Sequence, residues 1–298
     1  MVTGSTGRIG CELTTRLEDL GADVVPVVMN GYPSMPKRIK WNAQSGPLLV
    51  KNIKDLKKVP PPEYLINLHW QVNRNLPFSR QLTYEIQSNV TEISFFWDWV
   101  AGLGLKRFIN VSTIKVFSEL NGRIIKSDTE PKPITPYGIA KLTAEKYFSA
   151  LFHASSIPST HLRLCSVASC GEHPSQLMSQ LYQSAFNKNR IKLYALSNTS
   201  IIYIEEVIDL IISAAVNATK ERYLITKKIL SNAQIARRFE QISKHALNAE
   251  YLDTKPKIKN PVFISDVMKL RTSWTRTYSL DQMINEIIRK YSTAAKYI

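Results

Sequence analysis

The chain begins with three glycines spaced along a loop that joins a short apolar run to an amphipathic segment. Residues Thr3–Gly10 read Thr-Gly-Ser-Thr-Gly-Arg-Ile-Gly, and apolar residues then recur at helical spacing. In such a loop Gly4 permits the tight turn, Gly7 lets a phosphate approach the backbone, and Gly10 lets the helix pack on the strand. The amino end of that helix offers free N–H groups and a positive dipole end to phosphates. This context predicts a dinucleotide site, and the alternative is a turn with only a structural role.

The end of the predicted second strand indicates which dinucleotide is bound. An acidic residue there normally holds the ribose hydroxyls of the adenosine, but neither Val28 nor Asn30 offers a carboxylate. Lys37 and Arg38 follow shortly afterwards. The missing acid and the nearby bases favour NADP, with Arg38 binding the extra phosphate. The alternative is NAD, with its ribose bound by Asn30 and the two bases solvated.

Short apolar runs alternate with amphipathic segments along the first 167 residues. The alternation predicts an α/β fold of the Rossmann type, a doubly wound parallel sheet with helices on both faces. Strands are expected at residues 1–3, 23–29, 64–68, 108–112 and 161–167, and helices at 9–20, 88–102 and 137–150. Only Met1 and Val2 precede the glycine loop, so we expect either a start further upstream or low stability without bound cofactor.

Beyond Val167 the regularity weakens, which predicts a second structural unit. We assign residues 1–167 to the dinucleotide-binding domain, with 196–218 returning to it. Residues 168–195 and 219–298 are expected to form a smaller, mixed C-terminal lobe that binds the substrate. In the second of these stretches a helix at 231–245 should open with Ser231, because Gln234 completes a capping box.

Charge and composition narrow the possible partners. The net charge is +15, and residues 220–298 carry 16 basic against 7 acidic side chains. A basic surface suits an anionic partner, whereas a solvated surface without a partner is the alternative. We expect no nucleic-acid partner, because no zinc spacing or aromatic-interleaved basic run is present and RNA binding would rest on charge alone.

The same composition argues against a membrane protein and against a metal site. The most apolar stretch, residues 201–216, contains Glu205, Glu206 and Asp209, which excludes a membrane span. The three cysteines fit no metal spacing and no disulfide framework, and the first residues lack the pattern of a signal peptide. A cytoplasmic protein is therefore expected, with no membrane partner and no metal.

Tyr137 and Lys141 lie four residues apart in a predicted helix and so share one face. Thr135 is placed to cap this helix, and Pro136 suits its first position. A free tyrosine has a pKa near about 10 and is a poor base at neutral pH, but a neighbouring ammonium favours the phenolate. Such a pair can exchange a proton with a carbinol or carbonyl oxygen while a nicotinamide exchanges hydride with the carbon.

Hydroxyl groups follow the predicted strand at 108–112, at the carboxyl edge of the sheet. Open α/β sheets bind their ligands at that edge. Thr113 lies 24 residues before Tyr137, and its hydroxyl can hydrogen-bond the same substrate oxygen.

These features together resemble the extended short-chain dehydrogenase/reductase family, in its NAD-dependent epimerase/dehydratase group. The ordered matches are the glycine loop at 3–10, residues 65–70 where the family has its fourth-strand motif, Asn89-Val90, the segment 112–117, the Tyr-x-x-x-Lys at 137–141, Arg163-Leu164 and residues 203–207. They run along nearly the whole chain. The resemblance implies an oxidoreductase or epimerase acting on a nucleoside-diphosphate sugar, and a homodimer formed through the Tyr-Lys helix.

The resemblance also implies roles for individual residues. Thr113, Tyr137 and Lys141 would form the catalytic triad, and Lys141 would also hold the nicotinamide ribose. The residues expected to bind the cofactor are Gly4, Thr6, Gly7, Arg8, Ile9, Gly10, Asn30, Arg38, Leu68, Asn89, Tyr137 and Lys141.

The chain departs from the family pattern at two places that bear on function. The family's two small residues after the fourth strand are His69 and Trp70 here, and they would either crowd the cofactor or repack the loop; we favour repacking. Ile114 and Lys115 replace the Asp and Glu that follow the catalytic threonine in 4,6-dehydratases. The sequence therefore favours a 4-keto-sugar reductase or a C4 epimerase, and the alternative is a non-catalytic, dinucleotide-binding regulatory protein.

Overall fold

The computed structural model describes residues 1–29, 48–51, 53–59, 61–118, 122–252 and 261–295. Within these residues the main sheet has seven strands in the order β11-β7-β5-β4-β1-β2-β3, and every neighbouring pair is parallel. The strands are β1 (Val2–Thr3), β2 (Pro26–Met29), β3 (Leu48–Val50), β4 (Tyr64–Asn67), β5 (Arg107–Thr113), β7 (Ser159–Leu164) and β11 (Arg222–Ile225). The strand order reverses between β1 and β4, so the predicted doubly wound sheet is confirmed.

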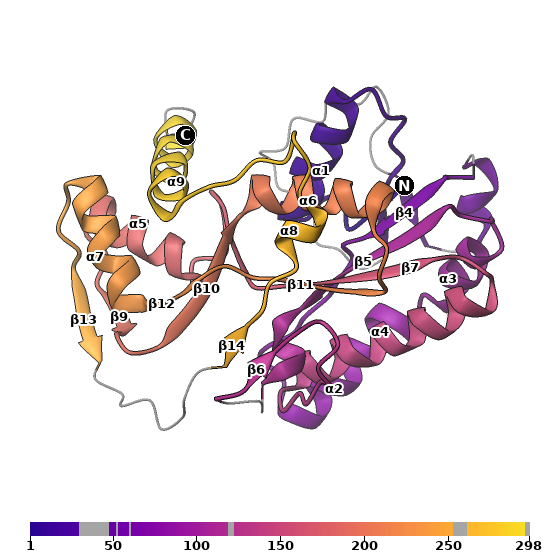
Figure 1. The fold of residues 1–298 in the computed structure, drawn as a ribbon, viewed down its shortest axis with the longest axis horizontal. Helices are drawn as coiled ribbons and strands as arrows, with labels where there is room; N and C mark the ends of the chain where they lie inside the picture. The colour runs from indigo at the N-terminus through magenta and orange to yellow at the C-terminus, as the bar shows by residue number, and fades with distance from the viewer. Residues whose placement is uncertain (30–47, 52, 60, 119–121, 253–260, 296–298) are drawn as a thin grey trace.

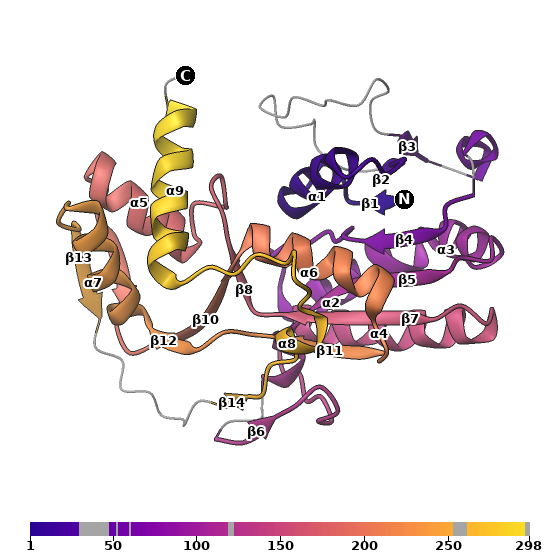
Figure 2. The same ribbon diagram turned by 45° about the horizontal axis from the view of Figure 1, so that its top comes forward.

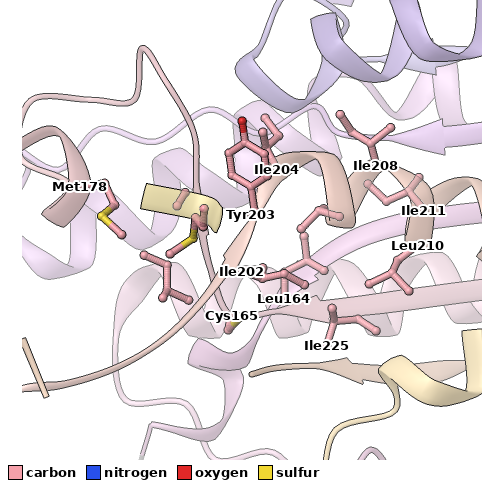
Figure 3. Close-up of a cluster of buried hydrophobic side chains, with 14 of the residues drawn as sticks. Leu164, Cys165, Met178, Ile202, Tyr203, Ile204, Ile208, Leu210, Ile211 and Ile225 are labelled. Carbon is pink, nitrogen blue, oxygen red and sulfur yellow. The ribbon is translucent and has the colours of Figure 1, made fainter. Parts of the chain in front are cut away.

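Helices cover both faces of this sheet (Figures 1 and 2). On one face lie α1 (Arg8–Asp19) and α6 (Ile204–Asn217), and on the other α2 (Phe78–Ile86), α3 (Ser94–Ala101) and α4 (Pro136–Ala154). Of the three buried apolar clusters among the described residues, the two larger ones lie on the two faces, and the largest continues into the smaller lobe. Figure 3 shows the larger cluster where α6 meets the strands, with Leu210 of α6 on the side of Leu164 and Ile225.

A row of hydrogen-bonded polar side chains crosses the middle of the sheet. Thr3, Asn67, Asn110 and His161 are register partners on β1, β4, β5 and β7, and all four are buried. The Thr3 hydroxyl donates to Asn67 (2.6 Å), the Asn67 amide donates to Asn110 (3.0 Å), and Asn110 meets Nδ1 of His161 (3.1 Å). Burial lowers the pKa of His161 to about 4, so its imidazole is neutral in this row. A slip of any of these strands would break the row, so it fixes their register.

The remaining elements form a smaller lobe and its connections. They are β8 (Ser166–Ala168), α5 (Leu177–Asn187), β9 (Ile191–Tyr194), β10 (Asn198–Tyr203), β12 (Ile229–Ser231), α7 (Asn232–Ser243), β13 (Ala249–Leu252), α8 (Val267–Leu270) and α9 (Leu280–Ala295). Strands β6 (Ile124–Ile125) and β14 (Val262–Phe263) pair with each other, and the turns η1 (Ile53–Lys58), η2 (Gln87–Thr91) and η3 (Ile114–Phe117) complete the described elements.

Two expectations about these elements were wrong. Residues 219–298 were assigned to the smaller lobe, but β11 extends the main sheet beside β7. A short edge strand carries too little periodicity to show which sheet it joins. The single helix expected at 88–102 is instead the π-helical turn η2 followed by α3, with α2 in front of both. The capping box of Ser231 and Gln234 is confirmed.

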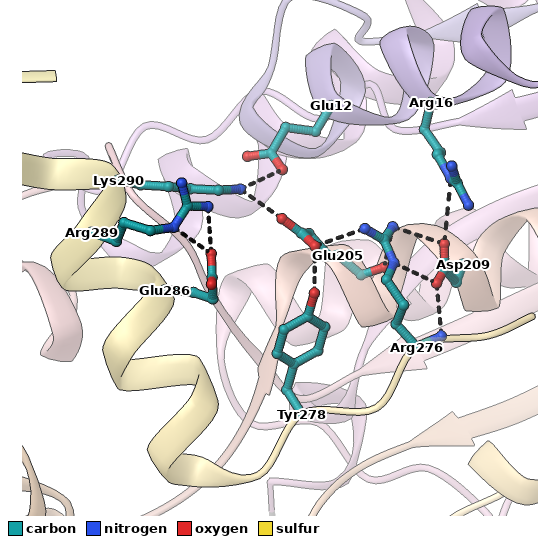
Figure 4. Close-up of polar contacts among 9 residues, drawn as sticks. All are labelled: Glu12, Arg16, Glu205, Asp209, Arg276, Tyr278, Glu286, Arg289 and Lys290. Carbon is teal, nitrogen blue, oxygen red and sulfur yellow. Dashed lines mark hydrogen bonds and ion pairs between the residues drawn. The ribbon is translucent and has the colours of Figure 1, made fainter. Parts of the chain in front are cut away.

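Ion pairs connect α9 and the segment just before it to α6 and α1 (Figure 4). Lys290 of α9 contacts Glu205 of α6 at 2.8 Å and Glu12 of α1 at 3.7 Å. Arg276, just before α9, contacts the fully buried Asp209 at 2.8 Å and Glu205 at 2.7 Å. Ion pairs therefore connect Arg276 and α9 to α6, and Lys290 also connects α9 to α1.

A buried ion pair ties α4 to β7. The Arg163 guanidinium donates to both carboxylate oxygens of Glu145, with the shortest contact at 2.7 Å, and the Ser112 hydroxyl donates to the same carboxylate at 2.5 Å. Both charged side chains are almost completely buried. Burial by itself would raise the pKa of Glu145, but Arg163 outweighs it and the pKa is lowered. The carboxylate therefore stays ionised, and each charge depends on the other.

Replacing Glu145 by Gln should destabilise the protein by about 3–5 kcal/mol, because it leaves the Arg163 charge buried without compensation. The midpoint of urea unfolding measures this loss. The matched control is Glu63→Gln, since Glu63 and Lys106 form an exposed pair at 2.8 Å, and its effect should stay below about 1 kcal/mol. Equal losses in the two variants would contradict the role given to the buried pair.

Candidate active site

The glycine loop lies at the carboxyl end of β1, at the point where the strand order reverses. Gly4 has a φ of +65°, and a Cβ there would lie 2.6 Å from the carbonyl carbon of Leu68. A Cβ on Gly10 would lie 2.2 Å from the carbonyl oxygen of Gly4. Only glycine therefore allows the loop to lie against the backbone after β4 and the helix α1 to pack against the loop.

The amino end of α1 is suited to a dinucleotide's phosphates. Gly7 is its N-cap and provides no side-chain hydrogen bond to the first turn, which contains no acidic residue. The buried Thr6 hydroxyl has no hydrogen-bond partner among the described residues. Backbone N–H groups and a hydroxyl are thus available for an anion at the positive end of the helix dipole. The residues present fit the cofactor that the loop predicts.

Arg8 and Ile9 contribute to this loop through their backbone. The Arg8 guanidinium donates to the carbonyl oxygen of Val167 (3.2 Å) and contacts Glu172 (3.5 Å), so it connects the glycine loop to the start of the smaller lobe. Ile9 is half-buried against the larger apolar cluster. Neither side chain is free to point toward a ligand, which leaves their N–H groups at the first turn of α1.

The beginning of α4 places Tyr137 beside Thr113. Thr135 caps the helix by accepting from the N–H of Gly138 (3.1 Å), and Pro136 occupies the first turn, as the sequence predicts. A Cβ on Gly138 would lie 2.6 Å from the carbonyl oxygen of Lys115 in η3. Glycine at 138 therefore lets the start of α4 approach η3, and η3 directly follows Thr113.

Tyr137 is a phenol whose proton is held firmly. Burial raises its pKa to about 12, and the hydroxyl of Thr113 partly offsets that effect. Thr113 accepts from the N–H of Lys115 at 3.2 Å. Its single hydroxyl proton bonds the Tyr137 oxygen in this state. Tyr137 is therefore protonated at neutral pH in this state and is set up as a proton donor.

Lys141 lies one turn further along α4 and is buried. Its ammonium donates to the carbonyl oxygen of Val111 at 3.0 Å. Burial lowers its pKa to about 7, and the carboxylates of Glu145 and Glu85 offset only part of that effect. A group of opposite charge or a hydrogen-bond acceptor next to this ammonium therefore decides whether Lys141 is charged at neutral pH.

Trp70 covers the same ammonium. The Lys141 nitrogen lies 3.9 Å from the centroid of the Trp70 ring, and the rings of Trp70 and Tyr137 are 6.3 Å apart in an edge-to-face arrangement. The indole N–H donates to the fully buried Glu85 at 3.1 Å. The sequence favours a repacked loop at these positions, and in the structure the Trp70 indole contacts two residues of the predicted catalytic triad. Glu85 had no sequence signal, because its helix α2 was not predicted.

The other expected cofactor residues take different places. Asn89 is buried, and its side chain bonds both the N–H (2.6 Å) and the carbonyl oxygen (2.9 Å) of Gln71, so it holds the loop after β4. Leu68 lies in that loop, and its N–H donates to the carbonyl oxygen of Thr3. Asn30 and Arg38, with Lys37, lie outside the described residues. His69 is buried, and burial lowers its pKa to about 4.

Two searches of the described residues bear on the kind of protein this is. No group of three or more histidine, cysteine, aspartate or glutamate side chains in the described ranges is arranged to hold a metal ion. Among the helices of the same residues, none combines the length and the apolar character needed to span a membrane.

Comparison with known proteins gives one family and many similar structures. The sequence model of the NAD dependent epimerase/dehydratase family matches residues 1–226. No curated protein sequence matches the chain. UDP-glucose 4-epimerase from Thermotoga maritima, solved with UDP-glucose, superposes with a TM-score of 0.83 and 17% identity, covering 99% of this chain and 98% of that one.

Two further structures extend the comparison. UDP-N-acetylglucosamine 4-epimerase from Methanobrevibacter ruminantium, in complex with UDP-N-acetylmuramic acid, has a TM-score of 0.83 and 16% identity over 98% of this chain and 97% of that one. RMD from Pseudomonas aeruginosa, complexed with NADPH, has a TM-score of 0.76 and 15% identity over 98% of each chain. At these identities the likeness concerns the fold.

The depressed pKa of Lys141 predicts how stability depends on pH. Its pKa is about 7 in the folded protein and 10.5 ordinarily, so between these values the unfolded chain binds more protons. Stability from this group is therefore present above pH 10.5 and is lost as the pH falls toward 7. Urea unfolding between pH 7 and pH 9 should show the wild type gaining stability relative to Lys141→Met as the pH rises.

The control for this measurement is Lys146→Met, which removes an exposed lysine from the same helix. Its stability difference from the wild type should not follow the trend of Lys141→Met. A stability difference between wild type and Lys141→Met that does not change with pH would show that Lys141 titrates at its ordinary value.

Proposed function

The chain belongs to the NAD dependent epimerase/dehydratase family, and on that premise we propose an NAD(P)-dependent oxidoreductase or epimerase of nucleoside-diphosphate sugars. The observation that carries the proposal is the convergence of Thr113, Tyr137 and Lys141 beside the glycine loop. Thr113 ends β5, and the other two residues share one face of α4. Loop and side chains thus meet at the carboxyl edge of the sheet, where an open α/β sheet binds its ligand.

The three side chains have different roles in the reaction at one substrate oxygen. Tyr137, protonated at neutral pH, donates its proton to a keto oxygen, or accepts one from a hydroxyl in the reverse direction. Thr113 hydrogen-bonds the same oxygen and orients it. Lys141 would bind the nicotinamide ribose, and once charged there its ammonium would favour the Tyr137 phenolate that the reverse direction needs. The nicotinamide, when bound at the glycine loop, supplies the hydride exchange at the sugar carbon.

The substrate class follows from charge and from the segment after Thr113. The basic surplus of residues 220–298 suits a diphosphate, and two structures of the same fold were solved with UDP-linked sugars. Ile114 is half-buried and Lys115 is exposed at the positions where 4,6-dehydratases carry an acid pair. Without those carboxylates the chemistry stays at one carbon and its oxygen. A 4-keto-sugar reductase or a C4 epimerase is the reaction we propose.

Cofactor, assembly and location complete the proposal. Val28 and Met29, the last two residues of β2, offer no carboxylate, which favours NADP and hence a reductase that exchanges its cofactor. We propose a cytoplasmic homodimer that pairs through α4, as the family resemblance implies. The smaller lobe, to which β10 also belongs and β11 does not, would close over the sugar.

One observation favours a second function, a non-catalytic protein of the same fold that senses dinucleotides. The Trp70 ring lies on Lys141, the side chain that would bind the nicotinamide ribose. Dinucleotide sensing, however, requires neither the proton-donating Tyr137 nor its neighbour Thr113. Turnover of a nucleotide sugar separates the two functions.

Tyr137→Phe should reduce turnover by about 100- to 10,000-fold, because it keeps the ring and removes the transferable proton. Dinucleotide affinity should change little. Steady-state assay of NAD(P)H oxidation with a nucleotide-linked 4-keto sugar measures the first quantity, and calorimetric titration of the cofactor measures the second. As a control, Tyr147→Phe on the same helix should retain full turnover. Turnover of Tyr137→Phe at the wild-type rate would remove Tyr137 from the mechanism.

Cofactor exchange separates reductase from epimerase. A reductase releases oxidised cofactor in every cycle, so the protein should purify largely without dinucleotide and oxidise one NADPH for each keto sugar reduced. NADPH should bind more tightly than NADH, because a charge-assisted contact to the extra phosphate contributes roughly 1.5–3 kcal/mol. Tightly retained NAD, together with interconversion of two sugar epimers without added cofactor, would establish the epimerase instead.

A further inference from the structure

Trp70 stands between the two helices that carry the catalytic and the supporting side chains. One face of its indole covers the ammonium of Lys141 on α4, with 3.9 Å between the nitrogen and the ring centroid. Its N–H points the other way, to Glu85 on α2 at 3.1 Å. The ring therefore lies between the Lys141 nitrogen and the Glu85 carboxylate, an arrangement that uses both the face and the edge of the indole.

Glu85 fixes the position of the Trp70 indole. It is fully buried, and its second carboxylate oxygen accepts from the amide of Gln81 at 2.8 Å. Each oxygen thus has a donor, and the donor to one of them is the indole of Trp70. A buried carboxylate that loses a donor is costly, so the indole is held in place at its edge as well as at its face.

The backbone on both sides of Trp70 is fixed, so only the side chain is free to move. The N–H of His69 donates to Asn67 at 3.2 Å. On the other side, both the N–H and the carbonyl oxygen of Gln71 are bonded by Asn89. A displacement of the indole is therefore a rotation about its side-chain bonds and needs no rebuilding of the loop.

The hydrogen-bond donors of the Lys141 ammonium show why the position of the indole matters for ligand binding. An ammonium has three N–H donors, and one of them is used by the carbonyl oxygen of Val111. The remaining side of the ammonium faces the Trp70 ring. A ribose whose hydroxyls bind Lys141 needs that same side.

We propose that Trp70 is a gate on Lys141: its indole occupies the position of the nicotinamide ribose and must rotate away before a dinucleotide can engage the catalytic side chains. The proposal rests on the proposed function, since it takes Lys141 as the ribose-binding residue. It predicts that only the fraction of molecules with Trp70 displaced binds the nicotinamide half, which raises the apparent Kd in proportion. The adenosine diphosphate half, bound at the glycine loop, does not meet the gate.

The test is calorimetric titration of the wild type and of Trp70→Ala with two kinds of ligand. NADP⁺ and NAD⁺ contain the nicotinamide ribose, whereas ADP and 2′-phospho-ADP lack it. With the displaced state at 1–10% of molecules, Trp70→Ala should tighten dinucleotide binding by roughly tenfold to a hundredfold and leave ADP affinity unchanged. Trp70→Phe keeps a ring over Lys141 but loses the N–H to Glu85, so it should give a smaller gain. Trp274→Ala, at a partly exposed tryptophan elsewhere in the chain, is the matched control.

The outcomes separate the gate from the function on which it rests. Unchanged or weaker dinucleotide binding in both Trp70 variants, with ADP still bound, would overturn the gate and leave the glycine-loop site in place. Failure of every nucleotide to bind wild type and variants alike would overturn the proposed function, and the gate with it. A gain in Trp274→Ala equal to that in Trp70→Ala would also overturn the gate, because the effect would not depend on Lys141.

Discussion

The row of polar side chains that runs from Thr3 through Asn67 and Asn110 to His161 is the constraint on which the rest of the site depends. Its hydrogen bonds are buried, so an unpaired member would be costly, and it aligns four central strands at the same height. Gly4 directly follows the first member and the loop with Trp70 directly follows the second. β1 and β4 end at this row, whereas β5 and β7 continue to Thr113 and Leu164. Because the four strands are parallel, the loops that leave them lie at the same edge of the sheet.

The α4 helix carries two of the three proposed catalytic side chains. Tyr137, Lys141 and Glu145 follow one another at intervals of four residues, so they lie along one face of the helix. Glu145 is fixed by Arg163 of β7, and Gly138 allows the start of the helix to reach η3. The helix is thus anchored at both ends of this face. The ammonium in the middle is buried and poorly compensated, so its state depends on what covers it.

Ion pairs relate the smaller lobe to this site. Lys290 connects α9 to α6 and α1, and Arg8 connects the glycine loop to Glu172 at the start of the lobe. These contacts are partly exposed, so each contributes little stability alone. They fix the position of α9 and of the start of the smaller lobe relative to α1, α6 and the glycine loop.

The sequence by itself determined the features that local chemistry dictates. The glycine loop, the Thr135 cap and the Tyr137–Lys141 spacing each depend on residues within a few positions of one another, and the alternation of strands and helices followed from hydrophobic periodicity. Only the tertiary structure decided that Trp70 lies on Lys141, that β11 joins the main sheet, and that Glu85 supports the indole. Trp70 and Lys141 are 71 positions apart, and no periodicity reports which side chains meet across such a distance once the chain has packed.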